Sequence, residues 1–230
     1  GDKLRGWHAE LTRMEFLFRY LDGKHNGSLW RSLWLPFAKA ADKESLMMHG
    51  AARQMTAIWN RYSRAERNRM FKTRYEVPAL RIKGPRGEAT SFTRQELISI
   101  ALNVGNDGNV RALVDGFDWF KDRFETDYVA AKKKIVAELD TVLTERDWET
   151  VQAIWNLIAQ FRDEAFALQK DLTGLEPEAV QSESVTTRYG ELAGGYYPLK
   201  FDRSRDLRVE KTDVKQEVQE LHGSNWTAPM

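Results

Sequence analysis

The sequence contains no cysteine and only four histidines, and these shortages remove several classes of site. Without thiols the chain forms no disulfide, holds no zinc or iron–sulfur cluster through sulfur, and offers no cysteine nucleophile. The histidines lack the H-x-x-x-H and H-E-x-x-H spacings that place metal ligands on one helix face; they are His8, His25, His49 and His222. We therefore expect no metal ion and no cofactor.

Long apolar runs and a large excess of charge of one sign are also missing. No run approaches the roughly 18 apolar residues of a membrane span, and the N-terminus shows no secretory signal peptide. The 35 basic and 34 acidic residues give a net charge of +1, which argues against a protein that is basic throughout but permits a local basic patch. Because the chain begins at Gly1 without a methionine, we expect a fragment excised from a larger protein.

Apolar residues instead recur at helical spacing over most of the 230 residues. The Thr93-x-x-Glu96 pair has the form of a capping box, and Thr173-Gly174 is typical of a helix end. The predicted helices cover 7–21, 29–63, 94–103, 110–115, 118–143 and 148–172, with Thr144 as the cap residue before the last. In 29–63 we expect a kink or restart at Pro36 and a further break at Asp42 or Gly50. Its aromatic and methionine residues, Phe37 and Met48 among them, are expected to lie in the core. The predicted fold class is mainly α, a multi-helix orthogonal bundle with one or two small β-hairpins.

Two segments interrupt this helical pattern. Tyr75 to Ile82 alternates and then runs into Gly-Pro-x-Gly, and Val185 to Phe201 is built around glycine turns, so each predicts a small β element. We expect one helical domain over 1–202, with a sub-boundary near 75–92. A polar C-terminal tail follows over 203–230.

Residues 53–86 hold ten lysines or arginines and two acidic residues, with Tyr62, Phe71 and Tyr75 among them. Clustered cations with interleaved aromatic rings are a pattern of nucleic-acid binding. The candidate nucleic-acid-binding residues are Arg61, Arg64, Arg67, Arg69, Lys72, Arg74, Arg81, Lys83 and Arg86. The alternative, which we favour here, is a solvated helix end whose charge is balanced by the acidic residues between Asp115 and Asp127.

The string Gly194-Gly195-Tyr196-Tyr197-Pro198, called the strap below, is the most unusual in the sequence. Paired glycines allow the backbone to approach another surface closely, and tyrosine rings both pack and form hydrogen bonds. We expect the strap to fold back onto the helices; a surface that binds a peptide or ligand is the alternative.

No catalytic arrangement is evident. The loop Gly105 to Asn109 lacks the lysine and Ser/Thr of a phosphate-binding P-loop. Carboxylates such as Asp140, Asp147 and Glu164 fall at helix ends and on outer faces rather than in the facing pairs that glycosidases use. We name no catalytic, cofactor-binding or metal-binding residue.

Several short strings occur in one order along the second half of the chain. They are Thr93-x-x-Glu96-Leu97-x-x-Ile100-Ala101-Leu102-Asn103-x-Gly105-Asn106, Leu143-Thr144-x-x-Asp147-Trp148, Ile154-Trp155, Leu172-Thr173-Gly174 and Gly194-Gly195-Tyr196-Tyr197-Pro198-Leu199-Lys200. Over residues 93–202 this order resembles a helical region of the very large polyvalent proteins of tailed phages and prophages. Some of these proteins end in a PLxRFG motif, which this sequence lacks. The resemblance implies a phage-encoded part that travels in the virion and enters the host with DNA, and hence a location in the virion or the bacterial host cytoplasm. It carries over no catalytic residue.

The leading functional hypothesis is a non-catalytic structural or interaction module of such a protein. Its expected partners are other domains of the parent protein or other virion proteins. Nucleic-acid binding through the basic segment is the first alternative, and a regulatory cap or cryptic enzyme domain is the second.

Overall fold

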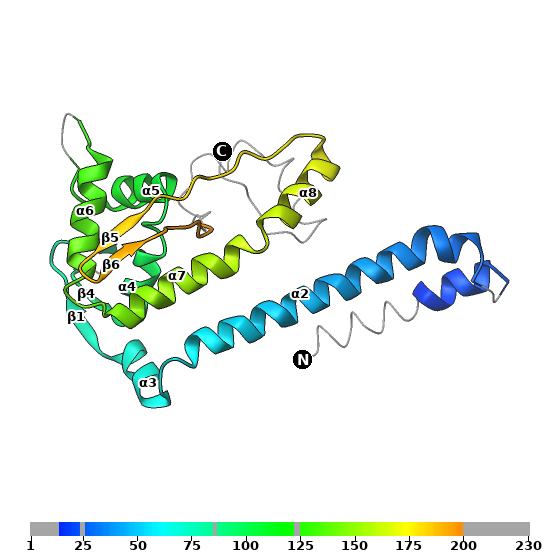
Figure 1. Ribbon diagram of the computed structural model, residues 1–230, viewed down its shortest axis with the longest axis horizontal. Coiled ribbons are helices and arrows are strands. Elements are labelled where there is room, and N and C mark those ends of the chain that lie inside the picture. The colour runs from blue at the N-terminus through cyan, green and yellow to red at the C-terminus, as the bar shows by residue number, and fades with distance from the viewer. Residues whose placement is uncertain (1–13, 24–25, 85–86, 122–124, 200–230) are drawn as a thin grey trace.

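A computed structural model describes residues 14–23, 26–84, 87–121 and 125–199 of the chain. Figure 1 shows a cluster of short helices at one end and a long helix that projects away from it. The predicted mainly α fold class with small antiparallel hairpins is confirmed. None of the helices in these ranges is long and apolar enough to cross a membrane. The predicted helix at 7–21 is described only from residue 14, and the tail over 203–230 lies outside the described residues.

The projecting part, called the arm below, comprises the described residues from 14 to 50. Its first helical segment runs from residue 14 to 21 and lies against the π-helical turn η1 (Trp30–Trp34) that opens α2 (Leu35–Trp59). Pro36 is the second residue of α2 and follows the π-helical turn η1 directly, so π geometry changes to regular α geometry close to the residue that lacks an N–H. Beyond this point α2 is continuous for 25 residues, so the further break predicted at Asp42 or Gly50 is wrong.

A capping box begins the next helix, α3 (Arg64–Lys72): the Ser63 hydroxyl accepts from the Glu66 amide, and the Glu66 carboxylate accepts from the Ser63 amide at 2.7 Å. The chain then forms two antiparallel ladders. The first pairs β1 (Arg74–Glu76) with β4 (Ser91–Thr93), and the second pairs β2 (Ile82–Gly84) with β3 (Gly87–Ala89). The predicted β element at 75–82 is thus one arm of a longer hairpin.

Five helices and a third ladder follow. They are α4 (Arg94–Ala101), α5 (Asp107–Phe117), α6 (Tyr128–Leu139), α7 (Glu145–Ala159), α8 (Arg162–Thr173), and the pair β5 (Val185–Thr187) and β6 (Gly190–Leu192). The predicted β element near 185–201 is confirmed for its first part.

Three predicted helices in this region have the wrong limits. The helix expected over 110–115 is α5, which begins at Asp107 after its cap residue Asn106 and continues to Phe117. The helix expected over 118–143 begins only at Tyr128, because Asp118 and Phe120 adopt positive φ of 55° and 52° and end helical geometry there. The helix expected over 148–172 divides near Phe161 into α7 and α8.

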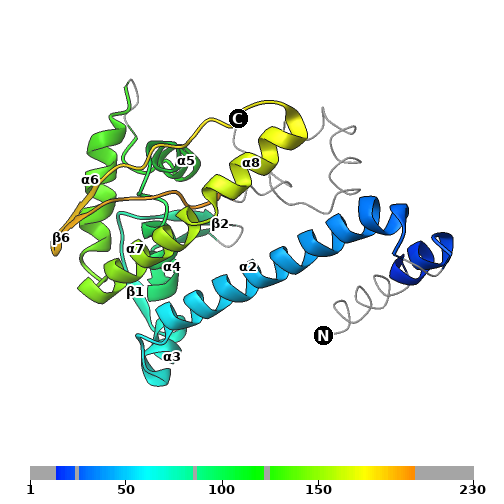
Figure 2. The ribbon, with the colours of Figure 1, turned by 45° about the vertical axis from the view of Figure 1, so that its right-hand side comes forward.

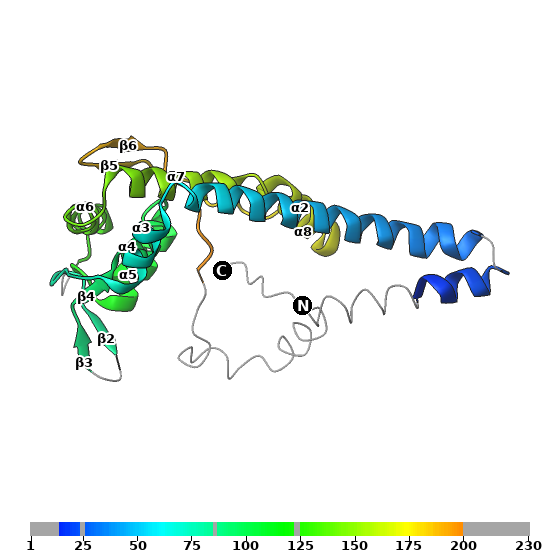
Figure 3. The same ribbon diagram turned by 90° about the horizontal axis from the view of Figure 1, so that it is seen from below.

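The hydrophobic core lies where α4, α6 and α7 meet the hairpins, at the end opposite the arm. Its largest fully buried side chains include Trp148 and Trp155 of α7, Leu97 of α4, and Leu139 of α6. The C-terminal part of α2 joins this core through Ile58 and runs antiparallel to α7, since Gln54 bonds Gln160 while Tyr62 bonds Thr150. Figure 3 shows α2 and α7 side by side, with the arm continuing beyond α7.

Candidate functional site

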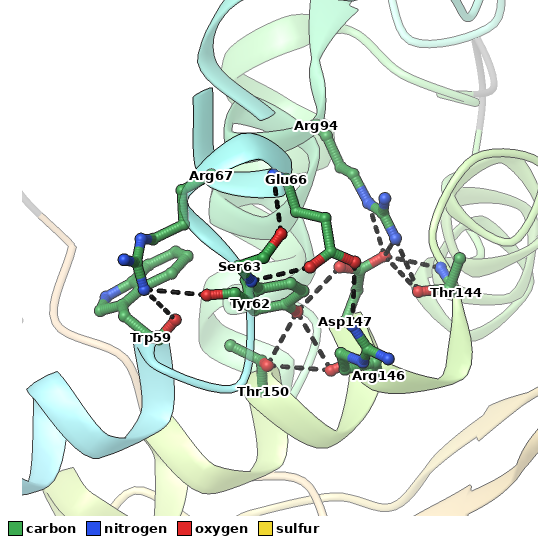
Figure 4. Close-up of polar contacts among 10 residues, drawn as sticks. All are labelled: Trp59, Tyr62, Ser63, Glu66, Arg67, Arg94, Thr144, Arg146, Asp147 and Thr150. Carbon is green, nitrogen blue, oxygen red and sulfur yellow. Dashed lines mark hydrogen bonds and ion pairs between the residues drawn. The ribbon is translucent and has the colours of Figure 1, made fainter. Parts of the chain in front are cut away.

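A buried polar cluster joins three parts of the fold, and Asp147 is its centre (Figure 4). Asp147 is the third residue of α7, where its carboxylate caps the helix by accepting from the Thr144 amide at 2.7 Å and the Thr144 hydroxyl at 2.8 Å. Arg94, the first residue of α4, donates its Nε to the same oxygen at 2.7 Å and forms an ion pair there. Tyr62, between α2 and α3, donates to the other oxygen at 2.9 Å.

The cluster is an anchor rather than a reactive centre. Asp147 is 0% exposed, and both of its oxygens already accept hydrogen bonds. Burial raises the pKa of the Tyr62 phenol well above its usual value, with the Asp147 charge adding to the rise and a hydrogen bond with Thr150 opposing it. A carboxylate with no free oxygen and a phenol that stays protonated leave no group to accept a substrate proton.

The strap folds back onto the helices, as its glycines predict. Gly195 lies directly on the buried Trp155 side chain of α7, and a Cβ atom at Gly105 would come 2.5 Å from the Gly195 carbonyl oxygen. The Gly105 carbonyl accepts from the Gly195 amide at 3.1 Å and from the Glu183 amide at 2.9 Å. Glycine is required on both sides because the two backbones touch.

Three asparagines around the junction of α4 and α5 complete this contact. Asn109 donates to the Asn103 side chain at 3.0 Å and to the Tyr197 carbonyl at 2.7 Å. Asn106 donates to the Gly195 carbonyl at 3.3 Å, and its own side-chain oxygen accepts from the Asn109 amide. Turn residues were the expected role of the Gly105–Asn109 loop; its second role, holding the strap, was missed because the strap lies almost 90 residues later.

The tyrosines of the strap are only half-buried, and Pro198 is exposed. Burial raises the pKa of the Tyr196 phenol. The backbone of the strap is therefore occupied within the chain, while parts of its side chains remain open to solvent. Binding of a partner by the strap stays a prediction.

The nine predicted nucleic-acid-binding residues have different surroundings. Arg67 is engaged at the end of α2, where it donates to the Trp59 and Tyr62 carbonyls (Figure 4). Arg74 bonds Ser91 and lies 3.7 Å from the Glu96 carboxylate, and Arg81 also has an interaction. Arg86 lies outside the described residues, and the side chain of Lys83 is also not described. The remaining four are exposed on or beside α3: Arg61, Arg64, Arg69 and Lys72.

Two of the acidic residues that we expected to balance the basic segment interact with their own neighbours. Asp115 pairs with Lys121 at 3.3 Å and accepts from the Tyr128 hydroxyl. Asp127 caps α6 by accepting from the Ala130 amide at 2.9 Å. The balance of charge between these residues and the basic segment stays a prediction.

The arm and α8 carry apolar side chains that the described residues leave open to solvent. Met48 of α2 is 66% exposed and Leu172 of α8 is 76% exposed, and no residue of α8 is buried. We call this the open surface; its other large members are Phe16, Leu17, Tyr20, Leu21, Leu33, Phe37, Leu46, Leu168 and Leu175. The expectation that Phe37 and Met48 belong to the core is wrong, since the core ends near Met55.

A seven-residue apolar repeat runs from η1 along α2 and passes through this surface. Trp34 of η1 and Ala41, Met48 and Met55 of α2 recur at that interval. Met55 packs against the core and Trp34 is buried beside Phe18, whereas Met48 between them is exposed. The repeat is therefore covered at both ends and exposed at Met48.

Within the described residues, no group of three or more His, Asp or Glu side chains is placed to hold a metal ion. An open hollow on α2 is lined by His49, Ala52, Arg53 and Thr56, and no carboxylate lines it. His49 is exposed there, and His8, His25 and His222 lie outside the described residues.

No protein-family model matches the sequence, and neither the curated proteins nor the solved structures include one that is similar to it.

Proposed function

We propose that this chain is a non-catalytic interaction module of a large phage or prophage polyvalent protein, carried in the virion and docked against neighbouring domains. The observation that supports this proposal most is the open surface of the arm and α8. Exposed apolar side chains that gather on one part of a protein mark interaction sites. The order of sequence strings over 93–202 supports the phage assignment.

The compact part explains how such a module holds its docking surface in place. Asp147 fixes the junction of α2 and α3 to α7 through Tyr62, and Arg94 fixes α4 to the same point. On the side of α7 nearer α8, Gln54 and Gln160 bond each other at 3.1 Å, and Lys43 pairs with Glu164 at 3.2 Å. These contacts orient the arm and α8 relative to one rigid base, as a docking surface needs.

The partner chemistry follows from the side chains on offer. The open surface offers flexible or branched aliphatic side chains, among them Leu46, Met48, Leu168 and Leu172. Such a surface fits the apolar face of one or two amphipathic helices, which gain affinity by burying it. We therefore propose helical segments of adjoining domains as the partners.

Hydrogen exchange tests the proposal. Exchange of this chain alone is compared with exchange of the same residues in the longer parent protein. Amides of 35–50 and 162–173 are expected to exchange roughly tenfold or more slowly in the parent, because docking removes local opening. Amides of α4 and α7 serve as the internal control, since the core protects them in both proteins.

A paired variant sharpens the result. Leu46→Gln with Leu172→Gln in the parent should return fast exchange to the arm and α8 without changing α4 or α7, because both side chains are already exposed. Equal exchange of the arm in the isolated chain and the parent would contradict docking. Absence of this chain's peptides from purified phage particles would contradict the virion assignment separately.

A further inference from the structure

The short helix α3 carries cations on the side that faces away from the core. Met70 is its buried residue and points inward, and Arg67 is held by carbonyls at the end of α2. Arg64 and Lys72 are two intervals of four residues apart, so they share the outer face over about 12 Å of helix axis. In Figures 1 and 2, α3 lies at the lower edge of the molecule, clear of the arm and of α8.

These cations lack compensating charge. Among the described residues, Arg61, Arg64, Arg69 and Lys72 make no ion pair. The two acidic residues of the same segment are already engaged. Glu66 accepts from its cap residue Ser63 and from Arg146 at 3.0 Å, and Glu76 accepts from Thr90 at 2.8 Å. The face therefore keeps a positive potential that attracts an anionic partner.

An aromatic ring accompanies the cations. Phe71 is 55% exposed and lies seven residues after Arg64, hence on the same side of α3. The other aromatic residues of the segment are not available for stacking, since Tyr62 is 2% exposed and hydrogen-bonded and Tyr75 is half-buried opposite Phe92. The cations and the exposed ring thus meet on one short helix.

We infer that this face of α3 binds single-stranded nucleic acid. Arg64, Lys72 and Phe71 lie within about 100° of one another around α3, Arg69 lies at the other edge of its exposed half, and Arg61 precedes the helix. Cations track the phosphates while an aromatic ring stacks on a base, which is the combination that single-strand binders use. Guanidinium groups, three of the four cations here, bind phosphate in a planar fork and stack on bases.

An anionic membrane surface is the less favourable partner. A helix that binds at a membrane interface places a broad apolar face among the lipid chains. In α3 the apolar positions are Ala65, Met70 and Phe71, and Met70 is buried in the core of the protein. A single exposed phenylalanine serves one stacked base better than it serves a bilayer.

The test uses fluorescence anisotropy of a labelled oligodeoxythymidine of about 20 nucleotides, long enough for a single site. Affinity is measured between 50 and 200 mM salt. Four phosphate contacts on a single strand predict a slope of log K against log salt of about −3. The triple variant Arg64→Gln, Arg69→Gln, Lys72→Gln should reduce that slope by about 2 and the affinity at the lowest salt by at least tenfold.

A matched control removes the same charge elsewhere. Lys39→Gln, Lys133→Gln and Arg162→Gln together change three exposed cations on other helices and should leave the slope almost unchanged. Phe71→Ala should lower the affinity about fivefold or more at every salt concentration without changing the slope, because stacking is not an ionic contact. Circular dichroism melting of each variant verifies folding.

Three outcomes would overturn the inference: no binding at 50 mM salt, equal losses in the triple variant and its control, or tighter binding to vesicles containing anionic lipid than to the oligonucleotide. The open surface takes no part in this experiment. Its result and that of the docking experiment are therefore independent.

Discussion

The consecutive helices α7 and α8 have the same spacing of apolar residues, but these residues are buried in α7 and exposed in α8. In α7 the apolar face, with Trp148, Val151 and Trp155, is buried; in α8 the continuation of that face through Leu168 and Leu172 is exposed. Within α2 the same contrast separates Met48, which is exposed, from Met55, which packs against the core. Periodicity therefore reveals that a helix face is apolar, whereas only the rest of the fold decides whether the same chain covers it.

The largest expected difference in the free energy of unfolding is between breaking the buried ion pair of α7 and breaking an exposed ion pair near the arm. Asp147→Ala should lower the free energy of unfolding by about 3–5 kcal/mol, because it leaves the Arg94 guanidinium without its buried partner. Glu164→Ala, which breaks the exposed pair with Lys43 near the arm, should cost at most about 1 kcal/mol. Urea unfolding followed by tryptophan fluorescence measures both.

If Asp147→Ala costs no more than Glu164→Ala, the contrast between a buried anchor and an exposed pair does not hold. Asp147→Asn is a useful intermediate, since it keeps the shape and removes the charge. It should be milder than Asp147→Ala because an amide oxygen still accepts from one donor.

Glycine substitutions give the next largest contrast. Gly195→Ala should destabilise the protein by about 1–3 kcal/mol, because the new Cβ would overlap the Trp155 side chain beneath it. Gly50→Ala lies in the middle of α2 with open space around it and should instead stabilise the helix by about 0.5–1 kcal/mol. Thermal melting of the two variants compares them, and equal changes of the same sign would remove the distinction.

The smallest expected effect depends on pH. Burial holds the folded-state pKa of Tyr62 above its unfolded value of about 10, so its contribution to stability is complete below pH 10 and is lost as pH rises further. Unfolding free energies of the native protein and of Tyr62→Phe are measured from pH 7 to 11. Their difference should stay constant up to about pH 10 and then fall; a constant difference throughout would refute this assignment.

Local signals made part of the fold predictable. The capping box of Thr93 with Glu96 begins α4 as expected, and Thr144 precedes α7 as expected. The positive φ of Asp118 and Phe120 carried no comparable signal, since neither is a glycine, and the helix limits there were missed. Short-range hydrogen bonds are readable in a sequence because both partners are a few residues apart.

The candidate sites depended on contacts that are distant in the sequence. Arg94 and Asp147 are separated by 53 residues, and nothing in their local patterns links them. The basic segment was visible in the sequence as a cluster. Only the fold shows that Arg67 donates hydrogen bonds to backbone carbonyls, whereas Arg64 is exposed and makes no ion pair within the described residues. The repeat from Trp34 to Met55 was present in the sequence, but only the fold separates its exposed member Met48 from its buried member Trp34.

The position of the strap near the end of the compact part also determines when its contacts can form during translation. Gly105 and Trp155 receive their cover from Gly195, which the ribosome adds last among the residues of that contact. Until then the Trp155 side chain lacks this cover, and the Gly105 carbonyl lacks the Gly195 amide, the later of the two amides that it accepts from. In nascent chains that end before Tyr197, one side of α7 therefore stays uncovered. Translation must pass this residue before the compact part can complete its packing.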